Sequence, residues 1–356
     1  MDEDFRLVSE LCEAHGPSGY EEPVRAVMRR WLEGCGDISH DRLGSLIVRT
    51  AGDESGPKIM LAGHLDEVGF MVSGIDDNGF VYFQTIGGWW EQVMLAQRVE
   101  IRTERGMVHG VIGSKPPHVL DADERKKLVD KRKMFIDVGV ASREEAEALG
   151  IQPGDPVTPL CPSERLGNPD FVLAKAWDNR YGCAVVTQVL RGLRGAAHPN
   201  VVYGVATVQE EVGLRGARTA AQTIMPDVAF SLDVGIAGDT PGVEPYEAQA
   251  RLGKGPAILI YDGSMIPNQP LRKLALEVAQ SEGIPVQQDL VRAGGTDGGA
   301  IHLTGSGVPS LVISVPTRYI HSAAAVFSLS DYRGAVRLVS ALVRRLDRET
   351  VAGLVG

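Results

Sequence analysis

Five short polar motifs in this chain each follow directly after an apolar run. In chain order they are Gly63-His-Leu-Asp-Glu67, Trp177-Asp-Asn-Arg180, Gln209-Glu-Glu-Val-Gly213, Phe230-Ser-Leu-Asp233 and Pro316-Thr-Arg-Tyr-Ile-His321. The carboxyl ends of parallel strands gather at one edge of a sheet, so we expect these motifs to meet there. Imidazole and carboxylate donors together suit zinc, cobalt or manganese. The set predicts a site for two divalent ions that share a carboxylate, roughly 3.5–4 Å apart.

Each motif taken alone has a simpler explanation. Asp178 precedes a predicted helix and would serve as an ordinary N-cap. Glu210 and Glu211 would be surface residues at a strand end, and His321 would more often be structural than a ligand. The combination of motifs, rather than any one of them, carries the metal hypothesis.

The spacing within two motifs suggests a division of roles. Residues two apart in an extended chain share a face, so Asp66 is placed to hold the second imidazole nitrogen of His64. Adjacent residues diverge, so one of Glu210 and Glu211 can bind metal while the other faces substrate. A metal hydrolase needs that pair, because a general base must take a proton from the attacking water.

Taken together, the motifs resemble those of the tetrahedral aminopeptidases, metallopeptidase family forty-two, which includes glutamyl and leucyl aminopeptidases and members labelled endoglucanase. The likeness covers nearly the whole chain and includes Val111-Ile-Gly-Ser-Lys-Pro-Pro117 and Gly295-Thr-Asp-Gly298. The resemblance implies a metal-dependent aminopeptidase that acts on peptides. It also implies dimers that assemble into hollow dodecamers.

The resemblance assigns a role to each site residue. Asp178 would bridge the two metals, which are expected to be zinc or cobalt, with manganese as a third candidate. His64 and Asp233 would complete one metal site, and Glu211 and His321 the other. Glu210 would be the general base, and Asp66 would orient His64. The sequence departs from the family after His321, where Ser322-Ala-Ala-Ala325 replaces a Ser-Pro and an acidic residue, which affects the expected loop shape and substrate preference.

The elements that must position these motifs follow from the apolar patterning. Helices are expected between Phe5 and Leu32, with a break at Gly16-Pro-Ser-Gly19, and then at 180–193, 216–223, 271–282 and 329–346. Strands are expected at 58–62, 171–176, 201–208, 228–232 and 310–315. This alternation predicts an α/β fold with a mainly parallel sheet flanked by helices.

The sequence pattern changes between residues 70 and 162, where short runs of alternating apolar and polar residues are separated by glycine-rich turns. We interpret this stretch as an inserted β-rich domain that resembles the family's dimerisation domain. The catalytic α/β domain would then comprise residues 1–69 and 163–356. Within the insertion, the charged run from Asp121 to Lys133 is expected to be an exposed loop, and Ser142 to cap a short helix.

Composition limits the function classes. The formal net charge of −10 argues against nucleic acid or an anionic membrane as the main partner. No apolar stretch approaches the length that spans a bilayer, and the acidic start does not resemble a signal peptide. The four cysteines are scattered without a C-x-x-C pair, which favours free thiols in the cytoplasm.

Several alternatives stay open on sequence grounds. A related dinuclear deacylase or carboxypeptidase would use the same metals, and Arg318 would be its candidate grip for a substrate carboxylate. A glycoside hydrolase is less favoured, since its two-carboxylate mechanism needs no histidine. A non-catalytic scaffold would have no use for Glu210.

The remaining histidines lack a supporting pattern of acidic residues. These histidines, expected to be solvated or structural, are His15, His40, His109, His118 and His198. His302 follows the loop at 294–299 and would lie near the site or simply pack, and Thr296 and Asp297 are candidates for lining the substrate cleft.

Overall fold

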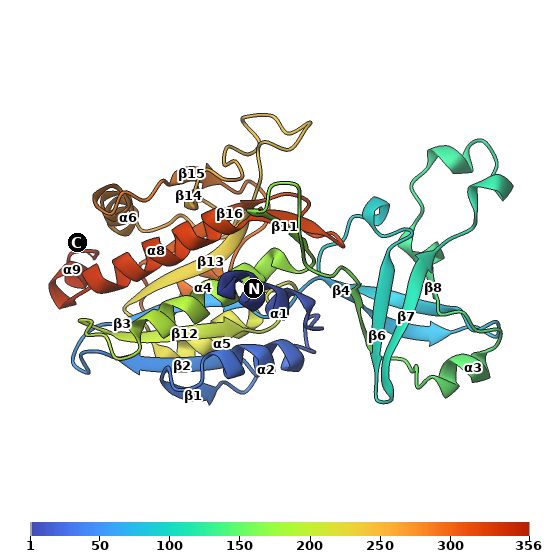
Figure 1. The fold of residues 1–356 in the computed structure, drawn as a ribbon, viewed down its shortest axis with the longest axis horizontal. Coiled ribbons are helices and arrows are strands. Elements are labelled where there is room, and N and C mark those ends of the chain that lie inside the picture. The colour runs from blue at the N-terminus through green and yellow to red at the C-terminus, as the bar shows by residue number, and fades with distance from the viewer. Residues whose placement is uncertain (1, 356) are drawn as a thin grey trace.

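A computed structural model describes residues 2–355, so residues 1 and 356 of the expected catalytic segments lie outside the described part. The chain forms an α/β body and, beside it, a small β-barrel (Figure 1). Among residues 2–355, no helix combines the length and the apolar composition needed to cross a bilayer.

The body is built on one eight-stranded sheet. In spatial order its strands are β1 (Asp37–His40), β2 (Leu46–Ala51), β12 (Val201–Thr207), β3 (Lys58–His64), β13 (Val228–Ile236), β16 (Ser310–Thr317), β14 (Ala257–Tyr261) and β15 (Gln287–Leu290). The four central strands, β12, β3, β13 and β16, pair in parallel, and antiparallel pairs lie toward both edges. The predicted mainly parallel sheet flanked by helices is confirmed.

Helices cover both faces of the sheet because its central strands are apolar on both sides. Ile59 and Leu61 of β3 contribute to one core, whereas Met60 and Ala62 contribute to the other. The helices on the first face are α1 (Glu3–Glu13), α2 (Glu22–Trp31), α4 (Trp177–Leu193), α6 (Gln269–Ser281) and α8 (Leu329–Arg345), followed by the short α9 (Arg348–Ala352). Those on the second face are α5 (Arg215–Ile224) and α7 (Gly298–Ile301).

The predicted helices are confirmed to within a few residues, and the break between α1 and α2 falls at the predicted turn. The prediction was incomplete for strands. β14 and β15 were not predicted, and the expected strand at 171–176 does not join the main sheet. It forms β11 (Phe171–Ala174), which pairs antiparallel with β10 (Glu164–Arg165) and β17 (Ala325–Ser328). Only alternate residues of β11 are fully buried, as expected for a strand outside the central parallel sheet.

Six strands between Gly69 and Pro159 close into an antiparallel barrel with a core of its own. In order around the barrel they are β4 (Gly69–Ile75), β5 (Val81–Ile86), β8 (Phe135–Asp137), β7 (Gly106–Gly113), β6 (Arg98–Thr103) and β9 (Pro156–Pro159). The charged run from Asp121 to Lys133 is exposed, as predicted, and contains only short 3₁₀ turns. The Ser142 hydroxyl caps α3 (Arg143–Ala148) by accepting a hydrogen bond from Glu145 N at 3.2 Å.

Candidate metal centre

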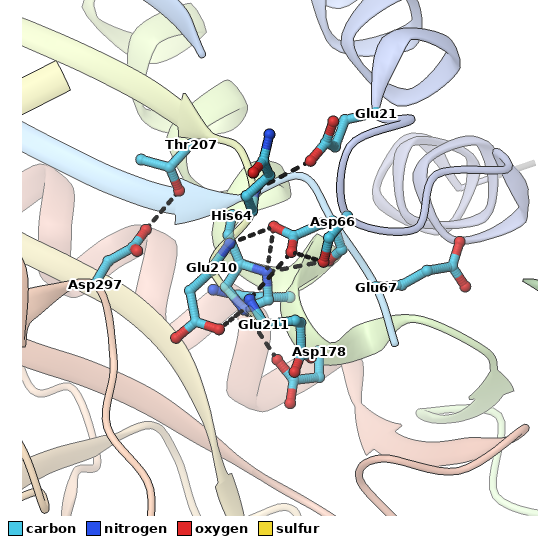
Figure 2. A network of polar contacts seen from close by, with 12 residues as sticks. Glu21, His64, Asp66, Glu67, Asp178, Thr207, Glu210, Glu211 and Asp297 are labelled. Atoms are coloured by element: carbon cyan, nitrogen blue, oxygen red, sulfur yellow. Dashed lines mark hydrogen bonds and ion pairs between the residues drawn. The ribbon is translucent and has the colours of Figure 1, made fainter. Parts of the chain in front are cut away.

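The carboxyl ends of the central strands place most of the predicted site residues. β3 ends at His64, and β12 ends just before the turn that carries Glu210 and Glu211. β16 ends at Thr317, shortly before His321. Figure 2 shows the side chains of His64, Glu210 and Glu211 close to one another and to Asp178.

Asp233 differs from the prediction that it ends a strand. It lies inside β13, which continues to Ile236 because its pairing with β16 extends as far as Thr317. The side chain is nevertheless within the cluster, with Asp233 Oδ1 4.0 Å from His64 Nε2.

Asp178 lies at the start of α4, where its backbone is not helical. The following turn of the helix packs directly on the sheet. A Cβ atom on Gly182 would lie 2.3 Å from the carbonyl oxygen of Leu232, so only glycine allows this approach. Asn179 donates a hydrogen bond from Nδ2 to the same oxygen at 2.7 Å. These contacts hold Asp178 above the sheet edge.

The two carboxylate oxygens of Asp178 face two different histidines. Oδ1 lies 3.2 Å from His64 Nε2, and Oδ2 lies 3.3 Å from His321 Nε2. A carboxylate between two imidazoles in this way is suited to bridging two cations.

Both neighbouring glutamates reach the cluster, on different sides of it. Glu211 Oε2 is 3.5 Å from His321 Nε2, whereas Glu210 Oε2 is 3.7 Å from His64 Nε2. Two sets of three residues each offer donor atoms that all lie within 4.8 Å of one another. One set is His64, Glu210 and Asp233, and the other is His64, Asp178 and Glu211.

Asp66 contacts His64 mainly through its backbone. His64 Nδ1 lies 3.0 Å from the carbonyl oxygen of Asp66 and 3.5 Å from its carboxylate. The carboxylate instead accepts hydrogen bonds from the backbone N–H groups of Glu210 and Glu211, at 3.0 and 3.1 Å, and from the Ser18 hydroxyl at 2.6 Å. Asp66 therefore fixes the turn that carries both glutamates as well as the ring of His64.

Two further anchors were not predicted from the sequence. The carbonyl oxygen of Gly88 lies 2.8 Å from His321 Nδ1, so a turn next to the barrel orients this ring. Buried Glu21 accepts a hydrogen bond from Gln209 N at 3.0 Å and so supports the turn that carries Glu210 and Glu211. Neither residue carries a local sequence signal, since both act through contacts between distant segments.

A buried ionic network lies beside the cluster. Glu67, whose side chain points away from the candidate cluster in Figure 2, contacts Lys175 Nζ at 2.6 Å and the Arg180 guanidinium at 3.0 Å. Glu67 and Arg180 belong to the predicted motifs, but the sequence did not indicate that they pair. The network joins the segment of Asp66 to the segment of Asp178.

The cluster is electrostatically incomplete without cations. Burial, reinforced by the charge of Asp178, raises the pKa of Glu211 to about 8 and that of Asp233 well above its ordinary range. Burial and the charges of Asp233, Asp297 and Glu211 also raise the pKa of Glu210. Within residues 2–355, the buried Oε1 atom of Glu211 has no hydrogen-bond partner. Because buried carboxylates require a compensating charge, this donor set fits divalent cations.

The pKa values of the two histidines are also raised, but here neighbouring negative charge acts against the effect of burial. Burial alone would lower the pKa of His321, but its hydrogen bond to Asp178 and the charge of Glu211 outweigh burial and raise the pKa to about 10. The pKa of His64 is likewise raised, since Glu210, Asp178 and Asp66 outweigh its burial. In the absence of metal, protons on the imidazoles would therefore supply part of the missing positive charge.

Of the four further residues that the sequence suggested near the site, only one lines the cavity above the cluster. Thr296 lines the cavity above the cluster, whereas Asp297 is buried behind it and accepts a hydrogen bond from Thr207. His302 Nδ1 contacts the carbonyl oxygen of Gly298 within its own helical turn and does not line this cavity. Arg318 is paired with Asp239 at 2.6 Å and does not line the cavity either.

Comparisons with known proteins agree on one family. A family model described as M42 glutamyl aminopeptidase matches residues 44–338. The chain is 40% identical to the putative aminopeptidase FrvX of Escherichia coli, over 98% of this chain and 97% of that protein.

Two solved structures resemble the whole chain. One is a TET aminopeptidase from a marine sediment archaeon, Thaumarchaeota archaeon SCGC AB-539-E09, with 50% identity, a TM-score of 0.97 and coverage of 99% and 100% of the two chains. The other is the Pyrococcus horikoshii TET1 peptidase, which can assemble into a tetrahedron or a large octahedral shell. It has 31% identity, a TM-score of 0.88 and coverage of 96% and 100%.

Proposed function

As a member of the M42 glutamyl aminopeptidase family, this chain is a hydrolase that acts on peptides, and we propose that it removes amino-terminal residues with two divalent metal ions bridged by Asp178. One observation carries the proposal: the two oxygens of Asp178 face the Nε2 atoms of His64 and His321. A single carboxylate can therefore belong to both halves of a dinuclear centre.

The proposed ligand sets combine this bridge with the roles that the family resemblance implies. His64, Asp178 and Asp233 would hold one ion, and Asp178, Glu211 and His321 the other. The raised pKa values of Glu211 and Asp233 support a cation beside each of them, because both carboxylates lack a compensating charge. Imidazole nitrogen and carboxylate oxygen favour zinc or cobalt, with manganese as a third choice. When bound, the ions would polarise the scissile carbonyl group and acidify a water molecule.

Glu210 is the proposed general base. It would take a proton from the attacking water and pass it to the amine that leaves. Its raised pKa, caused by burial and by neighbouring carboxylates, suits a group that must accept and then release a proton. Asp66 acts as a positioning residue, since its carboxylate binds the backbone N–H groups of both glutamates.

The alternative functions fit less well. A carboxypeptidase needs a cation for the carboxylate of its substrate, but Arg318 is already neutralised by Asp239. A scaffold protein would have no use for a second glutamate beside Glu211. A deacylase would share the metal chemistry and is separated from an aminopeptidase only by its substrates.

We propose that residues 70–162 form an inserted dimerisation domain and that residues 1–69 and 163–356 form the catalytic domain. The separate core of the barrel supports this division. Exposed apolar side chains on this stretch, including Met107, Val119 and Leu128, support a contact with a second subunit. By analogy with the assembling TET1 peptidase, dimers of this chain would build a closed particle such as a dodecamer.

A cytoplasmic location is also proposed. The four cysteines are free thiols, and Cys12, Cys35 and Cys183 are buried. Such thiols are typical of a reducing compartment.

Metal analysis combined with a substrate panel tests the proposed function. Purified protein should bind two divalent ions per chain, hydrolyse free aminoacyl amides and short peptides, and lose activity in EDTA. N-acetylated substrates should resist hydrolysis, because the cap removes the free amine. Full activity without metal would refute the mechanism, and a preference for N-acylated amino acids would favour the deacylase.

A further inference from the structure

The cavity above the proposed metal ligands is lined by uncharged residues everywhere except at the cluster itself. It has a volume of about 560 Å³. Apart from the acidic and imidazole side chains of the cluster, every described residue that lines it is uncharged. The largest of these are Leu214, Val234, Val291 and Ile320.

A second cavity adjoins the first and has the same character. It has a volume of about 700 Å³ and shares Gly88, Ile320 and His321 with the first cavity. Its walls include Trp90 and Val93, and within the described chain His321 is its only ionisable lining residue other than Tyr319. Because His321 lines both cavities, both adjoin the proposed metal centre.

Two arginines that adjoin lining residues in the chain are engaged elsewhere. Arg292 follows Val291 in the chain, but its guanidinium lies over the ring of Tyr246 at 5.7 Å. Arg318 is paired with Asp239. Neither arginine lines either cavity. An acidic substrate side chain would therefore find no basic partner in these walls.

We infer that this enzyme selects substrates whose amino-terminal side chain is uncharged and mainly apolar, such as leucine or methionine. The inference rests on the proposed function and specifies its substrate class. It holds for whichever cavity receives the side chain, because both have uncharged walls. A glutamate or lysine side chain would exchange water for walls that offer no counter-charge, which is unfavourable.

The residues of the metal centre do not supply the missing counter-charge for a charged substrate side chain. With the proposed ions bound, the charge of the carboxylates in the centre is already matched, so the centre offers a glutamate side chain no free counter-charge. A lysine side chain would have to compete for those carboxylates with the metal ions and the substrate's own amine. An apolar side chain, in contrast, gains from leaving water.

The first experiment compares leucine, methionine, glutamate and lysine p-nitroanilides with metal-replete wild-type protein. We expect kcat/KM for the two apolar substrates to exceed that for the charged ones on the order of 100-fold. A preference for glutamate or lysine would overturn the inference but leave the aminopeptidase intact. If none of the four were cleaved by protein that holds both metals, the proposed function itself would fail.

The second experiment adds one charge to each cavity. Val291→Lys alters the first cavity and Val93→Lys the second, and Val291→Met and Val93→Met are controls of similar length without charge. One lysine variant should raise the ratio of glutamate to leucine cleavage roughly 10-fold or more, because it supplies the missing counter-charge. The matching methionine variant should leave this ratio near that of the wild type.

The variant that responds identifies the cavity that holds the substrate side chain. Circular dichroism and metal content show that each variant is folded and loaded. If both lysine variants were intact and neither changed the ratio, the two cavities would not select the side chain and the inference would be wrong.

Discussion

Lys175 Nζ lies 2.6 Å from Oε1 and 2.8 Å from Oε2 of Glu67, and both side chains are buried. Glu67 immediately follows Asp66, and Lys175 ends the segment that leads to Asp178. This ion pair therefore couples the segments that carry Asp66 and Asp178, two residues of the candidate metal centre. Its strength bears on both stability and the geometry of the site.

Replacing Glu67 with Gln should destabilise the protein by about 3–5 kcal/mol, because it leaves the buried Lys175 ammonium without its partner. Denaturant unfolding of metal-free protein measures this change. Glu22→Gln is a suitable control, since Glu22 pairs with Arg102 at 3.4 Å on the surface. The control should cost no more than about 1 kcal/mol. Equal effects in both variants would show that the buried pair has no special role.

Asp178→Ala should reduce the binding of both metal ions, whereas His321→Ala should weaken only one. The reason is that the Asp178 carboxylate faces both histidines. Metal content after dialysis gives the stoichiometry, and Asp53→Asn, at an exposed position, serves as the control. Retention of two tightly bound ions by Asp178→Ala would refute the bridge.

The two neighbouring glutamates should respond differently to the same substitution. Glu210→Gln should keep both metals and lose roughly 10²–10⁴ in kcat, the usual contribution of a general base. Glu211→Gln should lose metal affinity first, and added metal should restore part of its activity. If the two variants exchanged these behaviours, the base and the ligand would be assigned the wrong way round.

Asp66→Asn should disturb the site more than Ser18→Ala. The Asp66 carboxylate accepts two backbone N–H groups from the glutamate turn, and an asparagine amide would direct its own N–H₂ group at one of them. Ser18→Ala removes only one donor to the same carboxylate. We expect a stability loss of about 1–3 kcal/mol and reduced kcat for the first variant, and about 1 kcal/mol with near-normal kcat for the second. Comparable kcat in both variants would contradict the positioning role.

His15 should make the protein less stable as the pH falls. Burial, together with the charges of Lys175 and Arg102, lowers the pKa of His15 to about 3. In the unfolded chain its pKa is about 6.5, so the unfolded state takes up a proton first as the pH falls. The free energy of unfolding is therefore not reduced by His15 above pH 6.5, and it falls progressively as the pH drops from 6.5 toward 3.

Urea unfolding of metal-free protein at pH 7 and pH 5 tests this linkage. Between these values wild-type protein should lose about 2 kcal/mol more stability than His15→Leu, since 1.5 pH units separate pH 5 from the unfolded pKa. The comparison with the variant removes the shared titration of the metal centre. Identical losses would show that His15 is not buried as a neutral ring.

Local sequence was sufficient for the α/β class and for most helices. Apolar runs such as Val201 to Val208 predict buried strands without any knowledge of their neighbours, because a strand that is buried on both faces must be apolar at nearly every position. The same logic located the polar motifs, since a parallel strand delivers the residues after it to one edge of the sheet. Irregular or half-buried strands such as β11, β14 and β15 were misplaced or missed, because a short run does not reveal its pairing partners.

The contacts that complete the centre required the tertiary structure. The sequence identified His64, Asp66, Asp178, Glu210, Glu211, Asp233 and His321 as residue types, and the fold brings all seven together. It did not reveal that Asp66 binds the glutamate turn, that Gly88 orients His321, or that Lys175 pairs with Glu67. Each of these contacts joins segments far apart in the chain. Hydrogen bonds and buried charges depend on distance in space, whereas periodicity reports only on the neighbourhood of each residue along the chain.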